Sequence, residues 1–320
     1  MMRVAILDDY QGMALRLADW QSLHPQAQMT AFSDHLDDED AVAHRLHTFE
    51  CVVLMRERTP FPASLLAKLP NLTLIVTPGM RNAAIDVAAA AERKVQVCGT
   101  DMLPYPTAEL AWGLILALVR HIPAEDRAVR DGRWQTTLGI GLKGKTLGLL
   151  GLGRLGGQVA EIGKAFGMEA IAWSQNLTAE RATAVGATLV GKDELFQRAD
   201  IVSIHVVLSP RSRGLVGPAE LGRMKRSAFL VNTSRGPVVD EGALLAALRE
   251  RRIAGAGLDV FEPEPLPKNH PLLALDNVVI TPHLGYVTEE NYRLLYGQAV
   301  EDIRAFLDGK PLRPLNAAAG

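Results

Sequence analysis

The chain has 320 residues, of which 48% are hydrophobic and 22% charged, and its formal net charge is −2. This length suffices for two domains of ordinary size, and the hydrophobic content indicates a globular protein with a substantial core. The near-neutral charge gives no reason to expect nucleic acid or an acidic membrane surface as a partner.

The amino-terminal segment and the cysteine usage favour a cytoplasmic protein. No apolar run reaches transmembrane length, and residues 1–9 read as a strand followed by acidic residues rather than as a secretory signal. Cys51 and Cys98 both lie within strand-like runs, which favours buried thiols in a reducing compartment. Two cysteines without a paired-histidine or H-x-E spacing predict no metal site.

Apolar, strand-like runs alternate with amphipathic or alanine-rich segments along the first hundred residues. Such alternation is typical of a parallel sheet with helices on both faces. The expected strands are 4–7, 29–32, 52–55, 74–77 and 95–98, and the expected helices are 13–20, 38–46, 63–69 and 84–92.

The alternation resumes after residue 145, between two long expected helices at 107–120 and 289–307. Because a complete α/β block precedes this second series, we expect the last helix to return to the first block. The predicted domains are therefore a discontinuous first domain, residues 1–101 with 286–320, and an inserted second domain, residues 102–285. The expected strands of the second series are 147–150, 170–173, 201–206, 229–232, 257–260 and 278–281.

A glycine-rich turn follows the first strand of the second series. Gly151 permits a tight turn, Gly153 lets the backbone approach a pyrophosphate, and Gly156 allows close packing of the following helix. The amides at the start of that helix would face the phosphates with the positive end of the helix dipole. The G-x-G-x-x-G pattern in this context predicts a dinucleotide site, with a plain tight turn as the alternative.

Three polar segments end later strands of the same series, where ligands bind in open α/β sheets. They contain Arg235, Glu264 and His283. A guanidinium can bind a carboxylate through two hydrogen bonds while it polarises a neighbouring carbonyl. An imidazole can donate or accept an alcohol proton near neutral pH, and a carboxylate behind it would orient the ring. Each residue alone could be a surface charge or a turn residue, but the joint pattern favours a functional site.

These motifs, in this order, resemble the D-isomer-specific 2-hydroxyacid dehydrogenase family, which includes phosphoglycerate, glyoxylate/hydroxypyruvate and D-lactate dehydrogenases. The resemblance covers nearly the whole chain. It implies a Rossmann dinucleotide-binding domain inserted into a flavodoxin-like substrate domain, both of them doubly wound parallel sheets. It also implies NAD(P)-dependent interconversion of a D-2-hydroxy acid and its 2-oxo acid, in the reductase direction, by a homodimer.

The resemblance assigns roles to individual residues. Arg235 matches the substrate-binding arginine of an N-x-x-R-G pattern, Glu264 the acidic residue before Pro-Leu, and His283 the acid/base histidine of T-P-H-x-G. These three are the expected catalytic residues. Backbone amides of Gly79 and Met80, together with Arg235, are expected to bind the substrate carboxylate. The expected cofactor-binding residues are Gly151, Gly153, Arg154, Leu155, Gly156, Ser174, Thr233, Ser234, Asp259 and Gly285.

The chain departs from the family pattern at the cofactor ribose. Ser174 stands where NAD-specific members carry a carboxylate that binds the ribose hydroxyls. Without that carboxylate a ribose 2′-phosphate is not repelled, so the chain leans to NADP or to use of both nucleotides. Gln175 and Asn176 follow, however, where NADP-preferring members have an arginine. Arg181 could reach the phosphate or could be a solvated helix residue.

A second departure lies in the substrate loop. Residues 80–84 replace the more usual glycine-rich G-x-G-x-D run, and the bulkier groups would reshape the pocket, so no particular acid is predicted. Arg56 and Arg81 could face the substrate or the solvent.

Two other functions share parts of this pattern. A nucleotide-sensing corepressor of the same fold would bind dinucleotide with little turnover. A formate dehydrogenase of related fold replaces the glutamate partner of the histidine with glutamine, and Glu264 argues against it.

Overall fold

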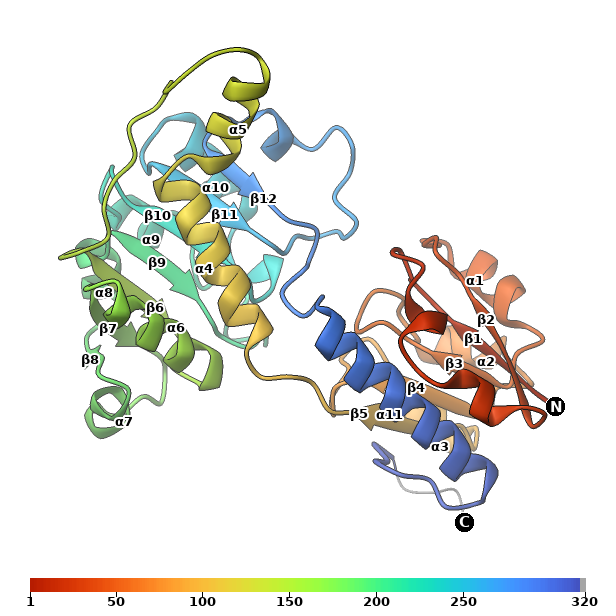
Figure 1. Cartoon of the computed structure of the whole chain (residues 1–320). Coiled ribbons are helices and arrows are strands. Elements are labelled where there is room, and N and C mark those ends of the chain that lie inside the picture. The colour runs from red at the N-terminus through yellow and green to blue at the C-terminus, as the bar shows by residue number, and fades with distance from the viewer. Residues whose placement is uncertain (317–320) are drawn as a thin grey trace. The chain divides into compact units, whose positions relative to one another are not determined.

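The computed structural model describes residues 1–316, which fall into two compact units. The first unit comprises residues 1–103 and 287–316, and the second comprises Pro104–Tyr286. Each unit contains one parallel sheet with helices packed on it (Figure 1), which confirms the predicted α/β class. Among the described helices, none is both long enough and apolar enough to cross a bilayer.

The first unit is built on a sheet of strand order β2-β1-β3-β4-β5, and its described strand pairings are parallel. The side chains of β3, β4 and β5 are buried on both faces, as expected of a parallel sheet covered by helices. The strands are β1 (Met2–Ile6), β2 (Ala27–Ala31), β3 (Cys51–Val53), β4 (Leu74–Pro78) and β5 (Gln96–Thr100).

Two sets of helices cover the sheet of the first unit. One set packs Val42, Leu65 and Ala90 into a core shared with Val52 and Ile75 of the strands. The long carboxy-terminal helix α11 returns to this unit and packs against β4 and β5, as Figure 1 shows. The helices are α1 (Glu39–Leu46), α2 (Ala63–Ala67), α3 (Val87–Glu92) and α11 (Glu289–Leu307).

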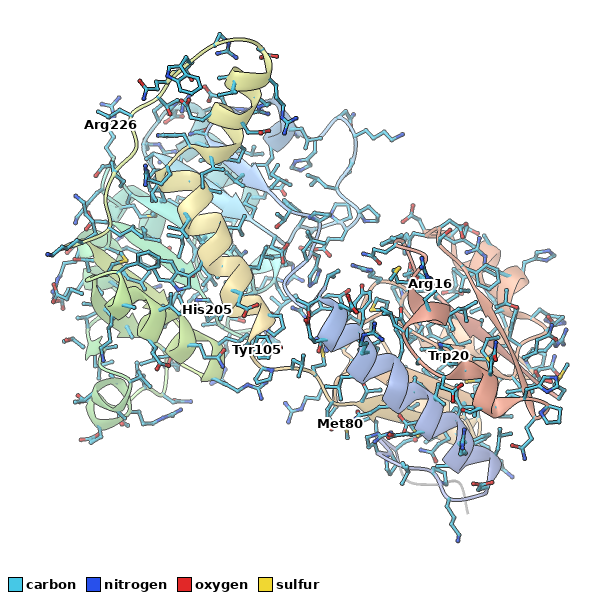
Figure 2. All side chains as sticks on the ribbon, viewed as in Figure 1. Arg16, Trp20, Met80, Tyr105, His205 and Arg226 are labelled. Atoms are coloured by element: carbon cyan, nitrogen blue, oxygen red, sulfur yellow. The ribbon has the colours of Figure 1, made fainter. Side chains whose placement is uncertain are left out.

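The prediction of a helix at residues 13–20 is wrong. In its place are two short 3-10 helices, η1 (Ala14–Arg16) and η2 (Trp20–Leu23). Side chains satisfy the backbone here instead of a continuous helix, because the Asp9 carboxylate accepts from the amides of Met13 and Ala14. The Trp20 indole donates to the Ala14 carbonyl over 2.8 Å, so that its ring, labelled in Figure 2, is buried against Tyr296 of α11.

The second unit is built on a sheet of order β12-β11-β10-β9-β6-β7-β8, again with parallel pairings. The order reverses beside β6, where a doubly wound sheet binds its ligand. The strands are β6 (Thr146–Leu150), β7 (Glu169–Trp173), β8 (Thr188–Leu189), β9 (Ile201–Ile204), β10 (Phe229–Asn232), β11 (Gly255–Leu258) and β12 (Val278–Ile280).

Helices pack on both faces of this second sheet. One core cluster joins Trp112 of α4 and Val159 of α6 to the sheet, and the other joins Leu195 of α8 and Leu244 of α10 to the opposite face. The helices are α4 (Pro106–Val119), α5 (Ile122–Arg130), α6 (Arg154–Ala165), α7 (Ala179–Ala184), α8 (Lys192–Arg198), α9 (Pro218–Arg223) and α10 (Glu241–Arg249), with 3-10 turns η3 (Gly236–Val238) and η4 (Pro271–Ala274).

Candidate active site

The glycine turn lies between β6 and α6, beside the reversal in strand order. Gly151 has φ of +101°, and a Cβ there would lie 2.8 Å from the carbonyl carbon of His205. A Cβ on Gly156 would lie 2.2 Å from the Gly151 carbonyl oxygen. Both positions therefore require glycine, one for the turn and one for the close packing of the helix on it.

Gly153 differs from its neighbours, because a Cβ there would meet no atom within 4 Å. It is exposed and precedes the first turn of α6, where the amides of Arg154 and Leu155 have no partner within the helix. Thr233 directly follows β10 in the same sheet. Its hydroxyl is buried without a hydrogen-bond partner among the described residues. An open glycine, a helix start and an unsatisfied hydroxyl fit a dinucleotide at this edge of the sheet.

Ser174 directly follows β7 and is half-buried, whereas Gln175 and Asn176 are exposed. Arg181 lies in the first turn of α7, where its amide donates to the hydroxyl of the N-cap Thr178 over 3.3 Å. Its side chain is exposed. The edge of the sheet at β7 thus carries no carboxylate at residue 174, and an arginine follows later in the chain, in α7.

His205, labelled in Figure 2, follows β9 and was not singled out by sequence reasoning. Its Nε2 lies 2.9 Å from the Ser203 hydroxyl, and burial lowers the pKa of the imidazole to about 4. The ring is therefore neutral at ordinary pH, and its backbone forms the wall against which Gly151 packs. In the sequence, the one feature that could have drawn attention to His205 is its position at the end of a strand.

The backbone around Arg235 is held by Asn232, whose side chain is 1% exposed. The Asn232 amide nitrogen donates to the Arg235 carbonyl over 3.0 Å, and its oxygen accepts from the Ser234 amide over 3.0 Å. The Ser234 hydroxyl donates to the Val206 carbonyl, which ties the loops after β9 and β10 together. Arg235 Nη1 donates to the Ser234 carbonyl over 2.7 Å. The backbone of Arg235 is thus fixed by the asparagine of the N-x-x-R-G pattern.

The glycine after Arg235 explains how the next loop approaches it. A Cβ on Gly236 would lie 2.4 Å from the Phe261 carbonyl carbon, so no other residue fits. The Phe261 amide in turn donates to Glu264 Oε1 over 2.8 Å. This close approach brings the loop that carries Glu264 against the loop that carries Arg235.

Glu264 and His283 form a hydrogen-bonded pair, with 2.6 Å between Glu264 Oε2 and His283 Nδ1. Their side chains are 27% and 17% exposed. His283 has φ of +56°, in the left-handed region that few non-glycine residues adopt, and its ring packs edge-on against Tyr286 with 5.6 Å between centroids. The left-handed backbone at His283 is part of the turn that places the imidazole against Glu264.

Asp259 holds the turn that carries His283. The carboxylate is fully buried and accepts from the Thr281 hydroxyl at 2.6 Å and from the amides of Leu284 and Gly285 at 2.7 and 2.9 Å. Burial raises the pKa of Asp259, while these hydrogen bonds act in the opposite direction. The described contacts make Asp259 a support of the turn that carries His283, and its expected contact with the cofactor stays a prediction.

The loop expected to bind the substrate belongs to the first unit and follows β4. Gly79 is buried with φ of +85°, and Met80, labelled in Figure 2, is 46% exposed. Arg56 follows β3, and its Nη1 donates to the Pro78 carbonyl over 3.1 Å. Arg81 is exposed.

The described residues of the second unit thus bring Arg235, Glu264 and His283 onto loops that touch one another, at the same edge of the sheet as the glycine turn. Among the residues that the structure describes, no group of three or more His, Cys, Asp or Glu side chains is placed to hold a metal ion.

Comparison with known proteins identifies the family. The model of the D-isomer specific 2-hydroxyacid dehydrogenase NAD binding domain matches residues 112–285. A glyoxylate reductase of Aeropyrum pernix is 44% identical over 256 residues, which are 77% of this chain and 76% of that protein. A D-3-phosphoglycerate dehydrogenase of Methanocaldococcus jannaschii is 41% identical over 263 residues, 81% of this chain but only 50% of that protein.

Solved structures agree with this match. The crystal structure of a phosphoglycerate oxidoreductase from Vibrio cholerae superposes with a TM-score of 0.92, at 39% identity, and covers 97% of this chain and 100% of that one. The resemblance seen in the motifs is confirmed along nearly the whole chain. The chain therefore belongs to the D-isomer specific 2-hydroxyacid dehydrogenase family and is an NAD(P)-dependent oxidoreductase that interconverts D-2-hydroxy acids and 2-oxo acids.

Proposed function

We propose that the chain reduces a 2-oxo acid to the D-2-hydroxy acid, with Arg235, Glu264 and His283 as its catalytic residues. The observation that carries this proposal is the 2.6 Å contact of Glu264 with His283, on a loop that packs against the glycine after Arg235. The similarity to a protein named glyoxylate reductase supports the reductive direction.

In this proposal Arg235 binds the carboxylate and the carbonyl oxygen of the substrate. Its guanidinium keeps its charge at every physiological pH and can form two parallel hydrogen bonds to a carboxylate. It would also stabilise negative charge that develops on the carbonyl oxygen during reduction. The hydrogen bonds of Asn232 to the backbone of Ser234 and Arg235 support a fixed backbone from which the Arg235 side chain extends.

In this proposal His283 transfers the proton to and from the substrate oxygen. NAD(P)H, when bound, supplies a hydride to the carbonyl carbon. The carbonyl oxygen then needs one proton, which His283 donates from Nε2, and in the reverse direction Nε2 accepts it. Glu264 accepts a hydrogen bond from Nδ1, which fixes the ring's orientation and leaves Nε2 to face the substrate.

In this proposal the backbone amides of Gly79 and Met80 also bind the substrate carboxylate. The left-handed Gly79 supports this assignment, because a turn of that kind exposes successive amides to an anion. The exposed Met80 and Arg81 side chains are the residues of this loop that would decide which 2-oxo acid is accepted.

The test is an absorbance assay with NADH or NADPH and a panel of glyoxylate, hydroxypyruvate, pyruvate and bulkier 2-oxo acids. Oxidation of either nucleotide at several turnovers per second with at least one acid is the expected result. Nucleotide binding with negligible turnover of the whole panel would favour the corepressor-like alternative and contradict the proposal.

For the cofactor, we propose use of NADP or of both nucleotides, because Ser174 supplies no charge to repel a 2′-phosphate. Ser174→Asp is expected to lower kcat/KM for NADPH about tenfold or more, through repulsion between like charges, while NADH is used as well or better. Arg181→Ala should lower kcat/KM for NADPH alone if the guanidinium reaches the phosphate. Arg198→Ala, which removes a half-exposed arginine of α8, is the matched control. An equal loss with both nucleotides in Ser174→Asp would contradict the proposal.

For the assembly, we propose a homodimer formed through the second unit. Residues 131–138 are all exposed and irregular, yet Glu125 orders them by accepting from the Thr136 and Thr137 hydroxyls at 2.9 and 2.6 Å. This segment holds Trp134 and Leu138 in solvent, 77% and 91% exposed. Large apolar side chains fixed in solvent mark a surface that a second copy can bury.

The double variant Trp134→Ser with Leu138→Ser is therefore expected to sediment as a monomer at concentrations where the unaltered chain is a dimer. Leu273→Ser removes another half-exposed leucine of the same unit and should leave the dimer intact. A double variant that still sediments as a dimer would place the interface elsewhere.

A reducing, cytoplasmic compartment is part of the proposal. Cys51 and Cys98 are free and buried. Burial raises the pKa of Cys98 to about 12, so the thiol stays protonated and unreactive.

A further inference from the structure

The segment after Gly79 lacks the glycine-rich run of the family pattern but contains a buried polar side chain. Asn82 is 7% exposed, although its neighbours Arg81 and Ala83 are exposed. A buried amide costs free energy unless its groups are paired, so its partners indicate what it is there to hold.

The partners of Asn82 lie on two different strand ends. Its Nδ2 donates to the Arg56 carbonyl after β3 over 2.8 Å and to the Thr77 hydroxyl of β4 over 2.8 Å. Its Oδ1 accepts from the Ala84 amide over 2.9 Å. One side chain therefore uses both donor hydrogens and one acceptor to join the start of the substrate loop, its end and the neighbouring strand.

Arg56 and Gly99 confine the same loop. Arg56 Nη1 donates to the Pro78 carbonyl, and a Cβ on Gly79 would lie 2.5 Å from that nitrogen. A Cβ on Gly99 of β5 would lie 2.7 Å from the Gly79 carbonyl oxygen, so the loop rests directly on the β5 backbone. With these two walls in place, the Asn82 bonds set where the Gly79 and Met80 amides lie.

The geometry points to Asn82 as a positioning residue for substrate binding, which holds the Gly79–Met80 backbone in the conformation that binds the substrate carboxylate. This inference rests on the function proposed above for those two amides. Asn82 replaces by side-chain hydrogen bonds the conformational control that a glycine-rich run gives elsewhere in the family. It acts on the binding of the 2-oxo acid and not on the nucleotide, whose glycine turn belongs to the second unit.

Asn82→Ala tests the inference, because it removes all three bonds without adding a charge. We expect KM for the best 2-oxo acid to rise about tenfold or more, and the inhibition constant of oxamate, a non-reactive analogue, to rise in parallel. The dissociation constant of NADPH or NADH should stay within about twofold. Thr77→Val, which removes one acceptor, should raise KM less, and Thr77→Ser, which keeps the hydroxyl, should restore a KM close to that of the unaltered chain.

Asn71→Ala is the matched control. Asn71 donates to the His47 carbonyl over 2.8 Å from the opposite end of β4, so its loss removes a similar bond away from the loop. It should leave KM unchanged even if Tm falls. An Asn82→Ala protein with the KM of the unaltered chain would overturn the inference while the proposed function stood. An unaltered chain that reduces no 2-oxo acid would overturn both.

Discussion

Replacing His283 is expected to lower kcat for 2-oxo acid reduction by about 100-fold to 10,000-fold, the usual contribution of a positioned general acid. Nucleotide affinity should remain close to that of the unaltered chain, because the glycine turn between β6 and α6 is separate from the His283 turn. Steady-state kinetics and fluorescence titration with NADPH or NADH measure the two quantities separately.

The choice of replacement at this residue matters, because His283 has φ of +56°. Alanine adopts this left-handed conformation with strain, whereas asparagine adopts it more readily. If the missing proton donor is the cause, His283→Ala and His283→Asn should lose similar activity. If only the asparagine variant regained turnover, backbone strain rather than proton transfer would explain the loss.

A second histidine–glutamate pair in the same unit provides the control. His270 Nε2 lies 3.1 Å from Glu241 Oε1, and its side chain is 10% exposed. His270→Ala should keep kcat within about tenfold, since its expected cost is a lost structural contact. An equal loss of turnover in this variant and in His283→Ala would remove the reason to single out His283.

Alternating apolar runs predicted most of the fold, because a parallel sheet buries its strands on both faces and leaves a continuous hydrophobic signal. The helix expected at 13–20 failed for a reason that lies outside local periodicity. The Asp9 carboxylate takes the amides of Met13 and Ala14, and Trp20 is drawn into the contact with Tyr296, which is distant in sequence. Competing side-chain bonds and a long-range packing partner cannot be read from a helical pattern.

The candidate site shows the same division. The placement of Arg235, Glu264 and His283 at one edge of the sheet could be predicted, because each follows a strand and strand ends share one edge. The supports behind them could not, since they depend on contacts between loops. Nothing in the sequence says that Asp259 accepts three bonds from the His283 turn, or that Gly236 packs on the Phe261 backbone. The same holds for Asn82, whose two acceptors lie 26 and 5 residues away along the chain.

Arg235 allows the geometric part of substrate recognition to be separated from the charge. Arg235→Lys keeps a positive charge but loses the planar fork that can bind a carboxylate through two hydrogen bonds. We expect kcat/KM to fall about 100-fold in Arg235→Lys and further in Arg235→Ala, because both the carboxylate and the developing charge on the carbonyl oxygen lose a partner. Initial rates over a range of 2-oxo acid concentrations, at saturating nucleotide, give both kcat and KM.

Arg213 is the control for loss of an arginine near the same loops. It pairs with Glu262 at 2.9 Å, but both side chains are more than half exposed, so the pair should contribute little to stability or catalysis. Arg213→Ala should therefore retain kcat/KM within about threefold, whereas Arg235→Lys should not. A lysine variant with unchanged kcat/KM would show that charge alone suffices at residue 235, and two-point binding of the carboxylate by this side chain would have to be abandoned. Because the Asn232 bonds fix the Arg235 backbone, removal of the guanidinium should leave the loop in place, so any loss reports on the side chain itself.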